Sequence, residues 1–271
     1  MKKYIEYYQI QSAAAKDCRL SRSEKRQTLL QKLSRLRAFF VTAVAFAVAG
    51  VGPDLFAFVG NDNEQWIGTW STALHQPLPG PPGLTNTGFN NQTLRQIVHT
   101  SVGGNQVRVR LSTFGASALV IGAAHIALRD AGAAVVPASD RTLTFGGQSS
   151  ISIPPGALVL SDPVDLDVPA LSDFAVSIYV PGVTGSATWH FMALQTSYIS
   201  TPGDFTGSVV VPVASMTQAW FWLSGVEVMA SKQTGGIVTF GDSVTDGTQS
   251  TPDTNNRWPD QLACRLMDQP Q

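Results

Sequence analysis

Leu94-Arg95-Gln96-Ile97-Val98-His99 is a short apolar run with interspersed polar residues, as is typical of a β-strand. The segment Gln106-Val107-Arg108-Val109-Arg110-Leu111 repeats this character. Successive side chains of a strand point to opposite faces of a sheet, so alternation of this kind gives one apolar face and one polar face. We therefore predict two strands, each with polar residues at alternating positions.

The same pattern returns through most of the chain. Further strands are expected at 124–128, 143–145, 174–180, 187–191 and 220–228. Turn signals rich in Gly and Pro separate these runs, for example Pro154-Pro155-Gly156 and Pro181-Gly182. No amphipathic helical segment lies between them. Many short strands without helices predict a mainly β fold, specifically an antiparallel β-sandwich or jelly roll over residues 61–231.

The character of the sequence changes near Ser231. Gly236-Ile237-Val238-Thr239-Phe240 is a β-branched apolar run that predicts a buried strand. A polar loop follows it, and then an amphipathic segment over 257–267 that predicts a helix. One βα unit cannot bury both faces of a parallel strand. Residues 232–271 therefore either dock on the β domain or open an α/β domain whose remainder is missing.

Charge is distributed unevenly along the chain. Residues 1–37 carry ten basic and three acidic residues, a net charge of +7, whereas the rest of the chain carries −8. Nucleic-acid binding needs a cationic surface on the folded part, and the acidic body does not provide one. Nucleic acid is therefore excluded as a partner.

The basic segment is followed by an apolar run over 38–52 that ends in small residues. This order is typical of a secretory signal. If the run is extended to residue 59, it approaches the length of a membrane anchor, and a soluble helix is the third alternative. We assign residues 1–60 to a basic leader with a signal or anchor segment, and expect a secreted, periplasmic or cell-surface protein.

The segment Phe240-Gly241-Asp242-Ser243-Val244-Thr245-Asp246-Gly247, followed by Asn256-Arg257-Trp258-Pro259-Asp260, resembles the first conserved block of the SGNH (GDSL-type) esterases and lipases. Earlier segments, such as Trp66-Ile67-Gly68-Thr69-Trp70-Ser71, resemble the amino-terminal β domain of a secreted branch of that family. The resemblance covers roughly residues 66–267. Position 245 is Thr, so the block is not a Gly-x-Ser-x-Gly elbow.

The resemblance implies acyl transfer from an ester of a small molecule, polysaccharide or lipid, without a metal or organic cofactor. Ser243 would be the nucleophile, and its backbone N–H one donor to the oxyanion. Gly241, Asp242, Asp246 and Gly247 would support the nucleophile turn. The later blocks of the family, including its Asp-x-x-His, find no match here. We therefore expect a truncated α/β (flavodoxin-like SGNH) domain and little activity from this chain.

Other interpretations use the same residues differently. Asp242 and Asp246 could form a carboxylate pair for glycoside chemistry or a hard metal. His99 or His190 could supply a base from the β domain, which would be unusual. Five tryptophans could form a sugar-stacking platform: Trp66, Trp70, Trp189, Trp220 and Trp222. This makes a non-catalytic carbohydrate-binding module the alternative function, although core packing is the simpler role for these rings.

Overall fold

Strands dominate the computed structural model, which describes residues 63–77 and 86–268. This part of the chain is 43% strand and 9% helix. All of its strand pairs are antiparallel. The prediction of a mainly antiparallel β fold is confirmed. The predicted leader and signal or anchor segment over 1–60 lies outside the described residues.

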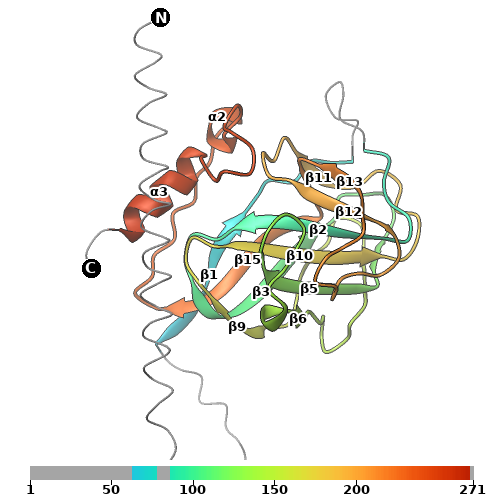
Figure 1. Ribbon diagram of the computed structural model, residues 1–271, viewed down its shortest axis with the longest axis horizontal. Coiled ribbons are helices and arrows are strands. Elements are labelled where there is room, and N and C mark those ends of the chain that lie inside the picture. The colour runs from blue at the N-terminus through green and yellow to red at the C-terminus, as the bar shows by residue number, and fades with distance from the viewer. Residues whose placement is uncertain (1–62, 78–85, 269–271) are drawn as a thin grey trace, which may run out of the picture. The chain divides into compact units, whose positions relative to one another are not determined.

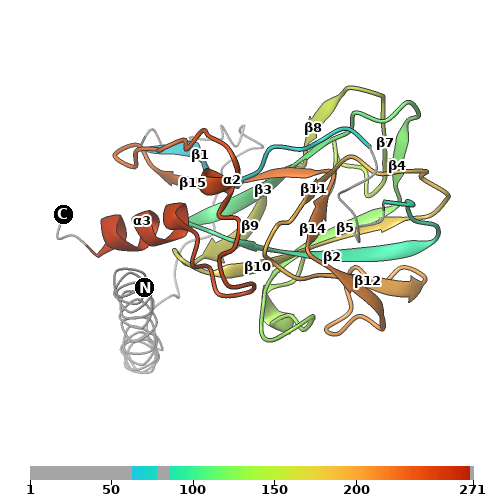
Figure 2. The same ribbon diagram turned by 90° about the horizontal axis from the view of Figure 1, so that it is seen from above.

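Two larger sheets and two short strand pairs make up this described β domain (Figures 1 and 2). The first sheet, in the order β1-β15-β3-β8 with β9 also on β3, contains β1 (Glu64–Ser71), β15 (Leu223–Ser231), β3 (Gly104–Ser112), β8 (Leu158–Leu160) and β9 (Val164–Val168). The second, in the order β13-β12-β2-β10-β5-β6, contains β13 (Val213–Thr217), β12 (Ser197–Pro202), β2 (Gln92–His99), β10 (Asp173–Val180), β5 (Ala123–Leu128) and β6 (Arg141–Thr142). The short pairs are β11 (Trp189–Phe191) with β14 (Ala219–Phe221), and β4 (Leu119–Ile121) with β7 (Ile151–Ile153). A 3-10 turn, η1 (Pro137–Ser139), precedes β6.

The main hydrophobic cluster joins side chains from both larger sheets. Val107 and Val109 of β3 belong to it, as do Phe174 and Val176 of β10. All four are almost fully buried. Residues of β3 alternate between buried and half-exposed, as the sequence predicted. Burial of this apolar surface is the main favourable term in the stability of the β domain.

Strand β2 differs from the prediction because it is buried on both faces. Arg95 is 1% exposed and Gln96 is 0% exposed, although they point to opposite sides of the sheet. Ile97 belongs to a second apolar cluster with Tyr198 and Val211, which covers the outer face of β2. The prediction of a polar face on this strand was therefore wrong. The loop after β12 covers that face, and the sequence of β2 alone does not reveal this.

Arg95 is surrounded by oxygen acceptors. Its Nε donates to Ser177 Oγ at 2.8 Å. Its two terminal nitrogens donate to backbone carbonyls of Ala133, Phe205, Thr206, Ser208 and Val209. Burial lowers the pKa of Arg95 to about 10, and the charge of Asp140 partly opposes this shift. The guanidinium therefore remains cationic at neutral pH and ties the 203–211 loop to the sheet.

We predict that Arg95→Lys lowers the free energy of unfolding by about 2–4 kcal/mol. An ammonium cannot reproduce the planar fork of donors, so buried carbonyls lose their partners. Chemical denaturation monitored by fluorescence measures the change. Arg141→Lys is the matched control, because Arg141 also donates to three backbone carbonyls but is partly exposed. An equal loss in both variants would contradict the organising role of Arg95.

Asp162 holds the Gly146-Gly147 turn. Its carboxylate accepts from Thr144 Oγ1 at 2.6 Å and from the N–H groups of Gly147 and Gly146 at 2.7 and 3.0 Å. The hydroxyl of Thr144, and then the N–H of Gly147, lower the pKa of Asp162 below its ordinary value of 3.8. The carboxylate form is therefore favoured by folding.

We predict that Asp162→Asn lowers Tm near neutral pH and that the difference from wild type shrinks in acid. The folded pKa of Asp162 lies below the unfolded one, so its contribution is complete above about pH 4 and is lost as pH falls through the folded pKa. Thermal unfolding from about pH 6 to about pH 2 measures this. Asp130→Asn, at an exposed position, serves as the control. A pH-independent difference would contradict the prediction.

Two predicted strands do not form as single strands in the structure. The run 220–228 divides into β14 and β15 at Trp222, whose φ of 56° interrupts the extended chain. The run 143–145 forms no strand of its own. Strand β6 ends at Thr142, and Phe145 only bridges to Gln148 across the glycine turn. The backbone conformation of single residues determines where these strands end, and a hydrophobic pattern does not predict that conformation.

The carboxyl-terminal segment confirms one predicted element and overturns another. Helix α3 (Trp258–Met267) forms where the amphipathic pattern predicts it. The predicted buried strand at 236–240 does not form, and Val238 and Phe240 are 90% and 100% exposed. A strand needs a neighbour for its N–H and C=O groups, and no described strand pairs with this segment. The described part of the carboxyl-terminal segment nevertheless belongs to the same compact unit as the β domain.

None of the helices in the described ranges is long and apolar enough to cross a membrane.

Candidate active site

Ser243 is the first residue of a single helical turn, α2 (Ser243–Asp246). Asp242 caps this turn, because its carboxylate accepts from the N–H of Val244 at 3.0 Å. Gly247 ends it with a φ of 88°, which favours glycine, and donates its N–H to the Ser243 carbonyl at 3.1 Å. A Cβ at Gly241 would collide with the side chain of Thr245. Three of the four predicted supporting residues thus shape the turn or contact its neighbours.

The side chain of Ser243 lies at the surface and makes no contact with other described residues that holds its hydroxyl. The residue is exposed, and no side chain or backbone group in the described ranges hydrogen-bonds to its Oγ. No strand leads into the turn, so the predicted strand-to-helix arrangement is reduced to an extended segment followed by a turn. None of the described histidines bonds to Ser243.

His190 connects the serine turn to the β domain. It lies in β11 and is 5% exposed. Its Nε2 lies 2.9 Å from Oδ1 of Asp246, the last residue of α2, and its Nδ1 lies 2.7 Å from the carbonyl oxygen of Ala73. The ring also lies near His75 and Trp220, with centroids 5.6 and 5.7 Å apart. This buried strand histidine therefore contacts the serine block through Asp246.

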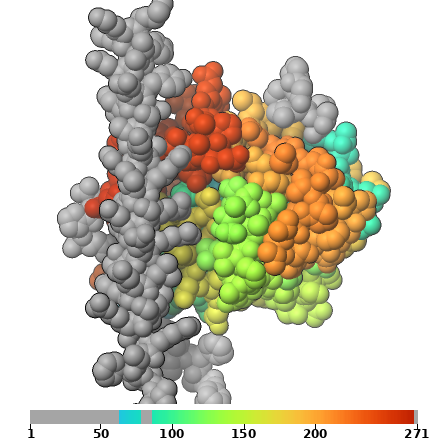
Figure 3. Space-filling model, viewed as in Figure 1, coloured from blue at the N-terminus to red at the C-terminus, as the bar shows by residue number. Residues whose placement is uncertain are grey.

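Asp253 attaches the loop between α2 and α3 to the loop after β11. Its carboxylate accepts from Gln195 Nε2 at 2.9 Å and from both N–H and Oγ1 of Thr196 at 2.6 Å. Its own N–H donates to the carbonyl of Leu194 at 2.9 Å. This is a close fit between two loops that are far apart in the sequence. We call the carboxyl-terminal residues 232–268 the tail. Figure 3 shows its red part directly against the orange and yellow segments of the β domain.

A third attachment lies at the end of β2. His99 Nδ1 is 2.7 Å from Asp173 Oδ1, and Asn255 Nδ2 is 3.0 Å from the same oxygen. Asn255 Nδ2 also lies 3.0 Å from His99 Nδ1. If His99 Nδ1 donates to the carboxylate, it has no lone pair left for the amide, so Asp173 is the acceptor of both. Asn255 Oδ1 is buried without a partner among the described residues, which costs stability.

Arg257 adds a fourth attachment just before α3. Its guanidinium lies 5.5 Å from the Trp220 ring and donates to the Ala193 carbonyl at 3.3 Å. Its Nε pairs with Asp260 at 2.9 Å. A Cβ at Gly247 would collide with the Arg257 side chain, so glycine is required there for close approach as well as for its backbone angle.

The other interpretations of these residues do not fit the geometry well. Asp242 caps α2 whereas Asp246 bonds to His190, so the two carboxylates are engaged separately. No group of three or more metal-ligating side chains occurs in the described ranges. Trp70, Trp189, Trp220 and Trp222 are at most 9% exposed and belong to the hydrophobic core. Trp66 is half-buried beneath Arg108.

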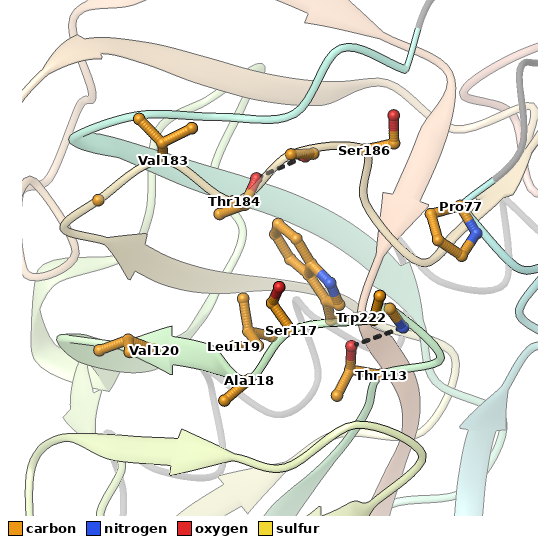
Figure 4. A pocket seen from close by; sticks show the side chains of 14 residues that line it. Pro77, Thr113, Ser117, Ala118, Leu119, Val120, Val183, Thr184, Ser186 and Trp222 are labelled. Atoms are coloured by element: carbon orange, nitrogen blue, oxygen red, sulfur yellow. Dashed lines mark hydrogen bonds between the residues drawn. The ribbon is translucent and has the colours of Figure 1, made fainter.

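Figure 4 shows a pocket of the β domain, which has a volume of about 340 Å³. Trp222 lines it, with hydroxyl-bearing side chains of Thr113, Ser117, Thr184 and Ser186. No charged side chain and no residue of 241–247 is among its lining residues. The pocket therefore does not contribute to the surroundings of Ser243.

Sequence reasoning missed the residues that hold the turn. Asp246 was predicted to support the turn, but its partner His190 lies 56 positions earlier, and Asp253 and Asn255 carried no motif. One signal was present: His190 is a polar residue inside an apolar strand, which demands a buried partner. The sequence alone could not identify that partner.

Comparison with protein-family models gave no match to this chain, and comparison with curated proteins gave none either.

We predict that Asp253→Asn loosens the tail without unfolding the β domain. Asparagine keeps the size and tolerates the φ of 59° at this position, but its amide cannot accept from all three donors. Trypsin cleavage after Arg257 should therefore become about 5- to 50-fold faster, corresponding to a loss of about 1–2 kcal/mol. Cleavage after the exposed Lys232 is the internal reference. Equal acceleration at both sites, or none at Arg257, would contradict the role of Asp253.

Proposed function

We propose that this chain carries the nucleophile of an SGNH-type serine ester hydrolase and that Ser243 is that nucleophile. The observation that carries the proposal is the exposed, unengaged hydroxyl of Ser243 at the start of a capped turn. It stands within the Gly-Asp-Ser-Val-Thr-Asp-Gly block on which the resemblance rests. In the reaction, Oγ attacks an ester carbonyl, the alcohol leaves with a proton, and water hydrolyses the acyl-enzyme.

A base bonded to Ser243 is the part of this chemistry that the described residues do not supply. His190 is engaged with Ala73 and Asp246, His99 with Asp173, and His125 Nδ1 with Asp140 at 2.8 Å. Without a base that removes the proton of Oγ, a serine enzyme loses several orders of magnitude in rate. We therefore expect the chain by itself to acylate slowly and to turn over little.

The proposal also covers the arrangement of the two larger sheets and the nature of residues 232–271. We propose that the two larger sheets form a β-sandwich and that residues 232–271 begin an SGNH-type α/β domain docked on it. Support for the first comes from the hydrophobic cluster shared by β3 and β10. Support for the second comes from helix α3 after the serine block. On the basis of the apolar run at 38–52, we propose a secreted or cell-surface location.

The proposed nucleophile is tested by covalent labelling of the full chain with a fluorophosphonate, with and without the tertiary amine N-methylmorpholine. The amine acts as an external general base for a serine that lacks its own. We expect labelling of Ser243 to be slow alone and about 10- to 100-fold faster with the amine. Mass spectrometry of the tryptic peptide between Lys232 and Arg257 measures it and separates Ser243 from Ser250.

Ser250 provides the matched control because it lies in the same peptide and is partly exposed. Ser243→Ala should abolish labelling of this peptide, whereas Ser250→Ala should leave it unchanged. If Ser243 reacts no faster than Ser250 in the presence of the amine, the proposed nucleophile is wrong.

A carbohydrate-binding module is not proposed as a second function. A sugar-stacking platform requires exposed aromatic faces, and four of the five tryptophans considered for it are at most 9% exposed.

A further inference from the structure

The imidazole of His190 faces an oxygen atom at each nitrogen. A backbone carbonyl such as that of Ala73 only accepts, so the bond at Nδ1 requires a proton on that nitrogen. At Nε2 the ring faces the carboxylate of Asp246 at 2.9 Å. The ring is therefore held between one oxygen atom of the β domain and one of the serine turn. The His190 side chain is 7% exposed and that of Asp246 is 31% exposed, so water has little access to the histidine end of the bond.

This bond acts on a very short segment. Asp246 is three residues after Ser243, and its N–H donates to the carbonyl of Asp242 at 3.0 Å, which closes the turn. A single helical turn has little stability by itself. Val244 is 71% exposed, so apolar burial does little to hold the turn in place. Its position therefore depends on its attachments to the β domain.

Backbone strain is concentrated where these attachments meet. Eight described non-glycine residues have positive φ, and five of them lie in the two contacting loops: Met192, Leu194, Gln249, Asp253 and Asn255. Such conformations cost energy and persist only where surrounding contacts determine them. Both loops are thus held in conformations that fit their contact rather than in their intrinsically preferred ones.

We propose that His190 is a positioning residue for Ser243, acting through Asp246 to fix the nucleophile turn on the β domain. The β domain would then determine the position of the nucleophile, without supplying a group that touches the substrate. This inference rests on the proposed function of Ser243. Its test therefore uses one measurement that depends on that function and one that does not.

The test compares His190→Ala, Asp246→Asn and the double variant with wild type in the full chain. The function-dependent measurement is Ser243 labelling in the presence of N-methylmorpholine. We expect His190→Ala to slow labelling about 10- to 100-fold, because small displacements of a reacting group have effects of this size. Asp246→Asn can still accept from Nε2–H but lacks the charge, so its effect should be smaller. The double variant should be no slower than His190→Ala.

The function-independent measurement is hydrogen exchange at the N–H groups of Gly247 and Thr248, both of which donate to the Ser243 carbonyl. These N–H groups should exchange faster in His190→Ala and, less strongly, in Asp246→Asn. His125→Ala is the control: it removes another His–Asp pair, formed through Nδ1 at 2.8 Å, and His125 lies in β5 with hydrogen-bond partners only at Asp140 and Thr142 among the described residues. It should leave both measurements unchanged, even where it lowers Tm.

The outcomes separate the two proposals. Unchanged exchange at Gly247 and Thr248 in His190→Ala overturns the positioning role, whatever happens to labelling. Faster exchange with no labelling of Ser243 in any variant, wild type included, supports the attachment and contradicts the nucleophile. Equal slowing of labelling in His125→Ala and His190→Ala would also overturn the positioning role, because general destabilisation would then explain both. If His190→Ala does not fold, the same two measurements on Asp246→Asn decide whether the bond between His190 and Asp246 positions Ser243.

Discussion

Polar side chains buried on β2 are the constraint on which the rest of this structure depends. A buried polar group without a partner is costly, so each of them requires a specific neighbour. Arg95 draws the 205–209 carbonyls over one face of the strand, and Gln96 pairs with both backbone groups of Phe221. His99 pairs with Asp173 at the end of the strand. One strand thus fixes a loop, a second strand pair and the docking point of the tail.

Attachment of the serine turn follows from that arrangement. Gln96 and Ile97 bind Phe221 and the Trp220 indole, which positions β14, and β14 pairs with β11. Strand β11 presents His190 to Asp246, and the loop after it presents Thr196 to Asp253. The tail has little apolar burial of its own, so polar contacts with the β domain account for its position.

The sequence predicted the parts of the structure that local pattern controls. Alternation predicted β3 and β10, and amphipathic spacing predicted α3. It failed at Gly236-Ile237-Val238-Thr239-Phe240, which has high β propensity, because no strand in the part of the chain that the structure describes pairs with this segment. It also failed at Arg95 and Gln96, because a loop more than 100 residues away covers Arg95, and Phe221 of β14 pairs with Gln96 on the other face. Motif recognition identified Ser243 and Asp246, whereas the contact of Asp246 with His190 required the tertiary structure.

The central claim is that a buried histidine of the β domain bonds to the serine turn. The most direct measurement is the ¹⁵N chemical shift of the His190 ring nitrogens in wild type and in Asp246→Ala. The account predicts that the Nε2 signal moves strongly when Asp246 is removed, that the Nδ1 signal moves less because Ala73 still accepts from it, and that the His125 signals stay in place. An Nε2 signal that is the same in both proteins would contradict the account, because His190 and Asp246 would then not be bonded in solution.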